Sequence, residues 1–146
     1  MTMRLTHVTV VVKNQDEALK WYTEKLGFEK RSDDSTTMPG YRWLTVSPAG
    51  QTDIEIVLNM PPAVVDEAHK EMVESMMKMV GKNSTWVLWT DDCMKTYKEL
   101  SAKGVKFPFP PEKQSFGVSA VFVDLYGNPY NLVERPMPQP ARSASR

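Results

Sequence analysis

The sequence carries one pattern twice, and this repeat limits the possible folds more than any other feature. A β-branched run, a helical stretch that ends at glycine, and two further strands around a glycine turn occur at 4–58 and again at 85–134. The landmark glycines stand at one constant separation: Gly27 with Gly104, and Gly50 with Gly127. A separation that holds at matching landmarks indicates an internal duplication.

The repeat predicts an α+β fold of two tandem βαβββ modules. A length of 146 residues suits a single domain. We expect that domain to contain module 1 (4–58), a methionine-rich helical linker (59–84) and module 2 (85–134). The tail at 135–146 is rich in proline and small polar residues, so we expect it to be disordered.

The composition excludes several classes of protein. Lys plus Arg and Asp plus Glu both number 18, so the net charge gives no electrostatic case for a nucleic acid or an anionic membrane as partner. No apolar run is long enough to span a bilayer. Cys93 is the only cysteine, so no disulfide forms within the chain, and we expect a structural role for it and a cytoplasmic location for the protein.

Local patterns place the elements within each module. Residues 4–12 are apolar and β-branched and predict a strand, after which Asn14 suits the N-cap of a helix. Polar and proline-rich stretches at 32–40 and 107–113 are expected to be loops. Helical spacing of apolar residues over 64–80, four of them methionines, predicts a linker helix.

One face of the first module's sheet carries two residues with chemical potential. Alternation along a strand puts His7 and Glu55 on the same face, while Val8 and Ile56 belong to the opposite, apolar face. A glutamate between two isoleucines needs a polar partner on its own face. Parity also places Trp43 and Trp89 on the inner faces of the two modules.

Three stretches of the sequence resemble a known protein family. The stretches 5–10 (LTHVTV) and 21–28 (WYTEKLGF) resemble the opening of vicinal oxygen chelate proteins, and 124–129 (DLYGNP) resembles their closing turn, with Leu125 in place of the usual proline. This superfamily includes glyoxalase I, extradiol dioxygenases, and the fosfomycin and bleomycin resistance proteins. The resemblance extends over 4–134 and implies the same fold, in which the two modules form a curled mixed sheet (a cup) with helices on the outer face.

The resemblance also implies where a metal would bind. In metal-dependent members each module supplies a histidine from its first strand and a glutamate from its last. His7 and Glu55 match this pair, whereas the second module has Thr85 and Asn131 at the matched positions. Glu134 falls on the opposite face. Only half of the expected site is present, so His7 and Glu55 either hold one divalent metal (zinc, nickel, iron or manganese) or are hydrogen-bonded polar residues of a pocket.

These alternatives lead to different functions. In the first, the protein is a metal-assisted lyase, isomerase or oxygenase of a small oxygen-bearing substrate, in which His7 and Glu55 hold the metal or Glu55 acts as catalytic general base. In the second, it is a metal-free, drug-sequestering binding protein whose ligand contacts Trp43, Thr85, Trp89 and Asn131. In the third, it is a structural or regulatory dimer with a vestigial cup. We expect a homodimer and a small-molecule partner.

Overall fold

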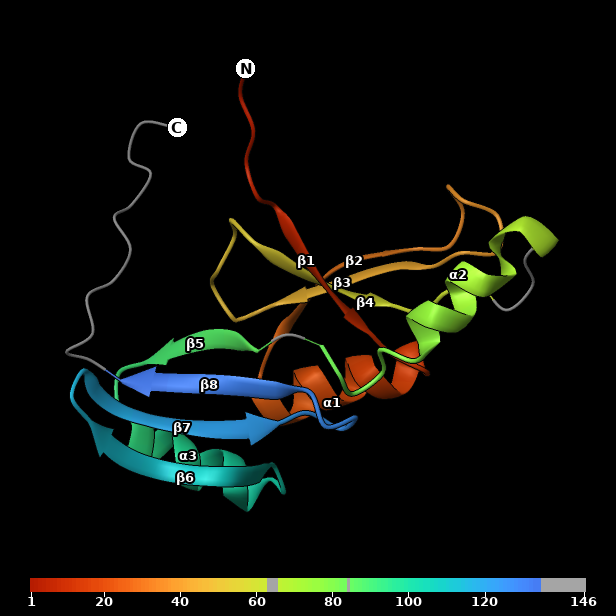
Figure 1. The fold of residues 1–146 in the computed structure, drawn as a ribbon. Coiled ribbons are helices and arrows are strands. Elements are labelled where there is room, and N and C mark those ends of the chain that lie inside the picture. The colour runs from red at the N-terminus through yellow and green to blue at the C-terminus, as the bar shows by residue number, and fades with distance from the viewer. Residues whose placement is uncertain (63–65, 84, 135–146) are drawn as a thin grey trace. The chain divides into compact units, whose positions relative to one another are not determined.

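The computed structural model describes residues 1–62, 66–83 and 85–134, and it contains two four-stranded mixed sheets and three helices (Figure 1). The chain divides into two compact units. The first comprises residues 1–84 together with 124–128, and the second comprises the remainder. The expected α+β fold of two tandem βαβββ modules with a curled mixed sheet is confirmed. The expected disorder of 135–146 concerns residues outside the described part.

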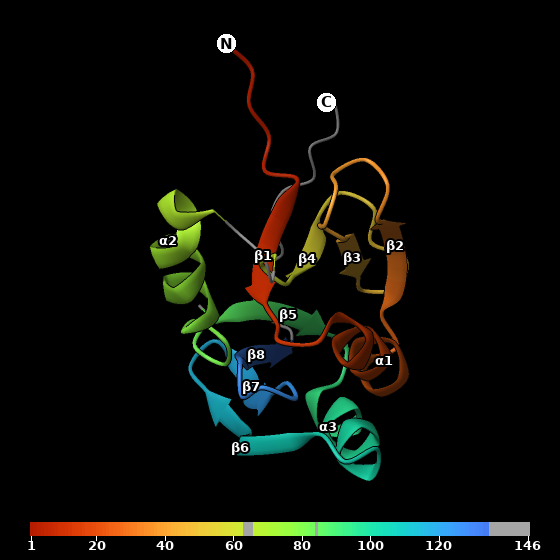
Figure 2. The same cartoon turned by 90° about the vertical axis from the view of Figure 1, so that its right-hand side faces the viewer.

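The sheet of the first unit has the order β1-β4-β3-β2. Its strands are β1 (His7–Val11), β2 (Glu29–Asp34), β3 (Trp43–Ser47) and β4 (Glu55–Asn59). β1 runs parallel to β4, and the other pairs are antiparallel. One face is covered by α1 (Gln15–Leu26), which contacts β2, β3 and β4 and buries Ala18 and Tyr22 (Figure 2).

Helix α1 begins and ends where the sequence predicts. The side chain of Asn14 accepts a hydrogen bond from the Glu17 backbone N–H, which satisfies one of the unpaired donors at the helix start. Gly27 ends the helix with φ of 70°, a left-handed conformation that glycine adopts without a steric penalty. These two ends fix the face of α1 that packs on the sheet.

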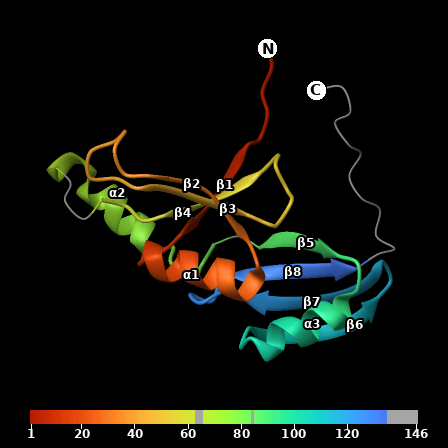
Figure 3. The same cartoon turned by 180° about the vertical axis from the view of Figure 1, so that it is seen from behind.

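The sheet of the second unit repeats this order as β5-β8-β7-β6. Its strands are β5 (Trp86–Thr90), β6 (Lys106–Gln114), β7 (Gly117–Val123) and β8 (Pro129–Glu134). Helix α3 (Cys93–Ala102) packs on β6, β7 and β8 (Figure 3). Phe122, Tyr130 and Leu132 form much of the core between them.

The expectation of a loop at 107–113 was wrong, because these residues lie within β6. Three of them are prolines, which cannot donate to a strand ladder. They are accommodated because β6 is an edge strand and because its register against β7 shifts between Lys106 and Phe109 and again between Phe109 and Glu112. An edge position with bulges tolerates proline, and that position is a tertiary property that local composition does not reveal.

The linker contains helix α2 (Glu67–Met77), shorter than the predicted 64–80, although 63–65 lie outside the described residues. Asp66 caps its start by accepting from the His69 backbone N–H. None of its residues is buried. Its attachment to the first unit includes Met76, whose Sδ lies 3.3 Å from the Asn59 Nδ2 at the end of β4.

The turn at 124–128 belongs to the first unit although its sequence lies in the second repeat. The buried Asp124 accepts a 2.6 Å hydrogen bond from the Tyr22 hydroxyl of α1, and it also accepts from the backbone N–H groups of Tyr126 and Asn128. Gly81 passes so close that a Cβ there would lie 2.3 Å from the Tyr126 carbonyl oxygen. The closing turn of the second repeat is therefore part of the first unit's core.

Candidate functional site

The predicted His7–Glu55 pair is assembled by the parallel pairing of β1 with β4. The register places His7 directly beside Glu55, so both side chains leave the sheet on the same face. The His7 Nε2 and Glu55 Oε1 are 3.8 Å apart, within ion-pair range but too far for a hydrogen bond. The side chains are 35% and 22% exposed, so a ligand can reach both.

Each member of the pair has its own hydrogen-bond partner. The Thr45 hydroxyl, from β3, donates to the Glu55 Oε1 at 2.6 Å. The His7 Nδ1 lies 2.8 Å from the Thr6 hydroxyl. Glu55 is thus held by a neutral donor on the neighbouring strand, which answers the question of how a glutamate between isoleucines is satisfied.

Trp43 extends this polar pair into an aromatic surface. Its ring meets the His7 ring edge to face, with centroids 5.3 Å apart and planes at 62°. It remains 36% exposed and lines a cavity of about 240 Å³ with four residues from the end of β2 and the following loop: Asp34, Thr37, Met38 and Tyr41. We call this cavity the aromatic pocket.

Two polar groups shape the wall of the aromatic pocket. The Tyr41 hydroxyl donates a short hydrogen bond to the Asn59 Oδ1, and burial raises the pKa of this phenol. Asp34 accepts hydrogen bonds from the hydroxyls and backbone N–H groups of Thr36 and Thr37, which lower its pKa to about 2. Asp34 therefore stays ionised and folds the loop onto itself.

A second cavity of about 270 Å³ lies on the same loop. Tyr41 lines it as well, together with residues from α1, the loop and the end of β4: Gln15, Ser35, Gly40, Arg42, Met60, Pro61 and Pro62. The positive charge of Arg42 is balanced by two carboxylates. Its guanidinium donates two hydrogen bonds of 2.8 Å to Asp33 and one of 2.7 Å to Asp16. This guanidinium holds the pKa of Asp33 below its usual value.

Sequence reasoning missed Tyr41, Met38 and the rest of the loop that forms the aromatic pocket. We expected only a polar loop at 32–40, and its long-range contacts are not encoded in local composition. One available signal was the spacing of Tyr41 and Trp43, which are two residues apart. Residues so spaced share a face of an extended chain.

The other predicted ligand-binding residues lie in the second unit. Asn131, on β8, pairs with Val87 of β5 and Val121 of β7, and it is half-buried. Thr85 is exposed and precedes β5, so the direct neighbour of Asn131 is Val87 rather than Thr85. Trp89 is 41% exposed and pairs with Val133. Their participation in ligand binding stays a prediction.

Glu134 has a structural partner. Its Oε1 accepts a 2.6 Å hydrogen bond from the backbone N–H of Cys93, the first residue of α3. A carboxylate there compensates the positive end of the helix. Cys93 itself is buried, and this burial together with the charges of Glu134 and Asp92 raises its pKa to about 11. A thiol so strongly protonated is a poor nucleophile.

The donor set does not fit a transition-metal centre of the usual kind. Such centres need three or more protein ligands. Within residues 1–62, 66–83 and 85–134, no group of three His, Cys, Asp or Glu side chains is placed to hold a metal ion. His7 and Glu55 supply two donors, and the Glu55 Oε1 is already bound by Thr45.

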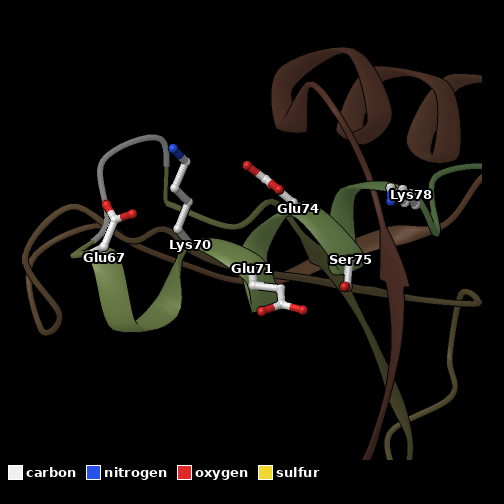
Figure 4. Close-up of a pocket in the computed structure, with 6 residues that line it drawn as sticks. All are labelled: Glu67, Lys70, Glu71, Glu74, Ser75 and Lys78. Atoms are coloured by element: carbon white, nitrogen blue, oxygen red, sulfur yellow. The ribbon is translucent and has the colours of Figure 1, made fainter.

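A hollow along α2 does not compete with this site. It measures about 540 Å³ and runs along α2, where it is lined only by polar side chains of that helix and of the residue that follows it: Glu67, Lys70, Glu71, Glu74, Ser75 and Lys78 (Figure 4). These side chains lie along a single convex helix and converge on no common point.

In the described part of the chain, no helix has the length and apolar character needed to cross a membrane.

Comparison with known proteins agrees with this architecture. The chain is 38% identical to UcmS2, whose crystal structure superposes with a TM-score of 0.78 over 92% of this chain and 100% of that one. TnmS3, an antibiotic binding protein from Streptomyces sp. CB03234, is 27% identical with a TM-score of 0.69, over 91% of this chain and 96% of that one.

Sequence relatives extend over the whole repeat. The uncharacterized protein YurT of Bacillus subtilis strain 168 is 35% identical over 136 residues, which are 91% of this chain and 100% of YurT. The model of the Glyoxalase/Bleomycin resistance protein/Dioxygenase superfamily matches residues 4–132. With two repeated modules and a match over most of its length, the chain belongs to the glyoxalase/bleomycin resistance protein/dioxygenase superfamily.

Proposed function

We propose that this protein binds and sequesters a small, planar, partly apolar molecule without a metal and without converting it. The observation that carries the proposal is the aromatic pocket, in which Trp43 joins a cavity wall of Tyr41 and Met38 to the polar His7–Glu55 pair. Small-molecule sites typically combine an apolar wall with a few fixed polar groups.

The chemistry of the lining selects this class of ligand. Exposed faces of tryptophan and tyrosine stack on flat rings, and methionine adapts to irregular outlines. Glu55 offers a carboxylate acceptor held by Thr45, and His7 offers a ring nitrogen at the edge of Trp43. The similarity to TnmS3, described as an antibiotic binding protein, supports a sequestering role.

Titration of tryptophan fluorescence and calorimetry with a panel of fused-ring aromatic compounds tests the proposal. We expect at least one compound to bind at micromolar concentration and to be recovered unchanged. Trp43→Ala should weaken binding at least tenfold, or about 1.4 kcal/mol. Trp21→Phe is the matched control, since Trp21 lies on α1 against Tyr22 and lines neither cavity. Binding that Trp43→Ala leaves unchanged would contradict the proposal.

A metal-assisted lyase, isomerase or oxygenase is the second candidate, and the adjacency of His7 and Glu55 is the observation that favours it. It requires further donors beyond these two, with Glu55 as ligand or general base. Metal analysis of protein purified without chelator separates the candidates. Stoichiometric zinc, nickel, iron or manganese that is lost in His7→Ala would replace the sequestering proposal with this one.

A homodimer is proposed as the functional form. Each sheet ends in edge strands, β1 and β2 in one and β5 and β6 in the other, and such edges favour pairing with another chain. Sedimentation velocity at micromolar concentration should give a dimer, and a monomer under these conditions would refute this part of the proposal. The cytoplasmic location stays a prediction.

A further inference from the structure

We infer that the natural ligand is a glycoside-like molecule, with a planar aromatic body in the aromatic pocket and an uncharged sugar-like arm in the neighbouring cavity. This inference rests on the proposed function and adds the chemical class of the ligand. We call the neighbouring cavity, lined by Gln15, Ser35, Gly40, Tyr41, Arg42, Met60, Pro61 and Pro62, the arm pocket.

The two cavities share Tyr41 as a common wall. Tyr41 lines both, and its hydroxyl donates to the Asn59 Oδ1, so the ring is held at the boundary where the two cavities meet. The cavities measure about 240 Å³ and 270 Å³. Each is smaller than the roughly 300–1,000 Å³ typical of sites for drug-sized ligands, whereas together they reach that range. A ligand of ordinary size would therefore occupy both sides of Tyr41.

The lining of the arm pocket is amphipathic. Tyr41, Met60 and two prolines give it apolar surfaces, while Ser35 and Gln15 add a hydroxyl and an amide. The Gln15 Nε2 donates to the Arg42 and Leu58 carbonyl oxygens, which leaves the amide oxygen as the acceptor it can offer. A sugar ring matches this mixture, because it has C–H faces that pack on aromatic and proline rings and hydroxyl groups around its edge.

The charges near the arm pocket argue against an anionic arm. Arg42 is the only cation among its lining residues, and its three guanidinium nitrogens already donate to Asp33 and Asp16. Two carboxylates thus face one guanidinium, so the charge at this cation is already more than balanced and a phosphate or carboxylate would gain no net attraction there. An uncharged, hydroxyl-bearing arm meets no such repulsion.

Calorimetric titration with 4-methylumbelliferone and its β-D-glucoside tests the inference. For the wild-type protein we expect the glucoside to bind at least tenfold more tightly than the free coumarin. Ser35→Phe, which fills the arm pocket from an exposed position, should reduce the glucoside to the affinity of the coumarin and leave the coumarin unaffected. Thr52→Phe, an exposed position that lines neither cavity, is the matched control.

The outcomes separate this inference from the proposed function. Equal affinity of the two compounds for the wild-type protein, or an equal loss for both in Ser35→Phe, would overturn the two-part ligand and leave the binding function standing. If neither compound binds and the fused-ring panel also gives no binder, the proposed function itself fails. Trp43→Ala should weaken the binding of both compounds, because the coumarin ring that they have in common would lie against Trp43 in the aromatic pocket.

Discussion

The two parallel strand pairs of this protein have the same topology but present different side chains. In the first unit, β1 and β4 place His7 beside Glu55 on a partly exposed face. In the second, β5 and β8 place Val87 beside Asn131, and the nearby acid, Glu134, turns instead to the start of α3. The two repeats thus share a backbone arrangement, while only the first places a histidine beside a glutamate.

The largest expected effect concerns the turn that connects the second repeat to the first unit. Asp124→Ala removes the acceptor of the Tyr22 hydroxyl and of two backbone N–H groups in a buried setting. We expect a loss of about 3 kcal/mol in the free energy of unfolding, measured by urea denaturation. Asp53→Ala, at an exposed position of the first unit, should change it by less than about 0.5 kcal/mol. Similar values for both variants would show that the turn is not a structural part of the first unit.

The first residues of the two helices offer a second comparison. Gln15 is the first residue of α1 and Cys93 is the first residue of α3, and both are buried. Gln15 carries a neutral amide, whereas Cys93 carries a thiol whose pKa is raised to about 11. Because the thiolate is the reactive form, Cys93 should react with Ellman's reagent at pH 8 about a hundredfold more slowly in the native protein than in urea. Fast reaction in the native state would mean that the start of α3 is open.

The raised pKa of Cys93 also makes the stability of the folded protein depend on pH. The pKa in the folded protein, about 11, lies above the ordinary value of 9.0. As pH rises, the Cys93 thiol loses its proton in the unfolded chain before it does so in the folded protein. The contribution of this thiol to the free energy of unfolding is therefore fully present below pH 9 and is lost as pH rises toward 11. Cys93→Ala should abolish that decline in the melting temperature between pH 9 and 11, and a decline of equal size in the variant would assign it to other groups.

The two glutamates of the last strands test the division of roles directly. Glu134→Ala should destabilise the protein by about 1 kcal/mol, because a charge at a helix start is lost. It should leave ligand affinity unchanged. Glu55→Gln should do the reverse, with weaker binding and little change in the unfolding midpoint. A stability loss confined to Glu55→Gln, or a binding loss confined to Glu134→Ala, would invert the assignment.

The smallest expected effect on stability concerns the connection between β2 and β3, which is compared with the connection between β6 and β7. The loop after β2 is held by Asp34, whose pKa is lowered to about 2 by Thr37 and Thr36. The stabilising effect of the Asp34 carboxylate is therefore present above pH 3.8, the ordinary pKa of this group, and disappears as pH falls toward 2. The melting temperature of the wild type should exceed that of Asp34→Asn at pH 5, and the difference should shrink by pH 2.

The turn between β6 and β7 provides the control for this comparison. It joins Gln114 to Gly117 through Ser115 and Phe116, none of which is acidic. Ser115→Ala should therefore give a difference that does not vary between pH 5 and pH 2. A constant difference for Asp34→Asn as well would show that the carboxylate does not organise its loop in solution.

The local pattern of the sequence determined the repeat, the α+β class, the caps of α1 and the shared face of His7 and Glu55. These features follow from periodicity and from the chemistry of single residues, which act over a few positions. For the same reason the sequence also revealed that the second copy lacks the acidic residue at the position of Asn131.

Only the tertiary structure decided the rest. The proline-rich stretch at 107–113 became a strand because β6 lies at a sheet edge. Thr45 became the partner of Glu55, and Tyr41 became the wall between two cavities, because β2, β3 and β4 bring distant residues together. Such contacts depend on register and loop path, which are set by packing across the whole unit rather than by neighbouring residues.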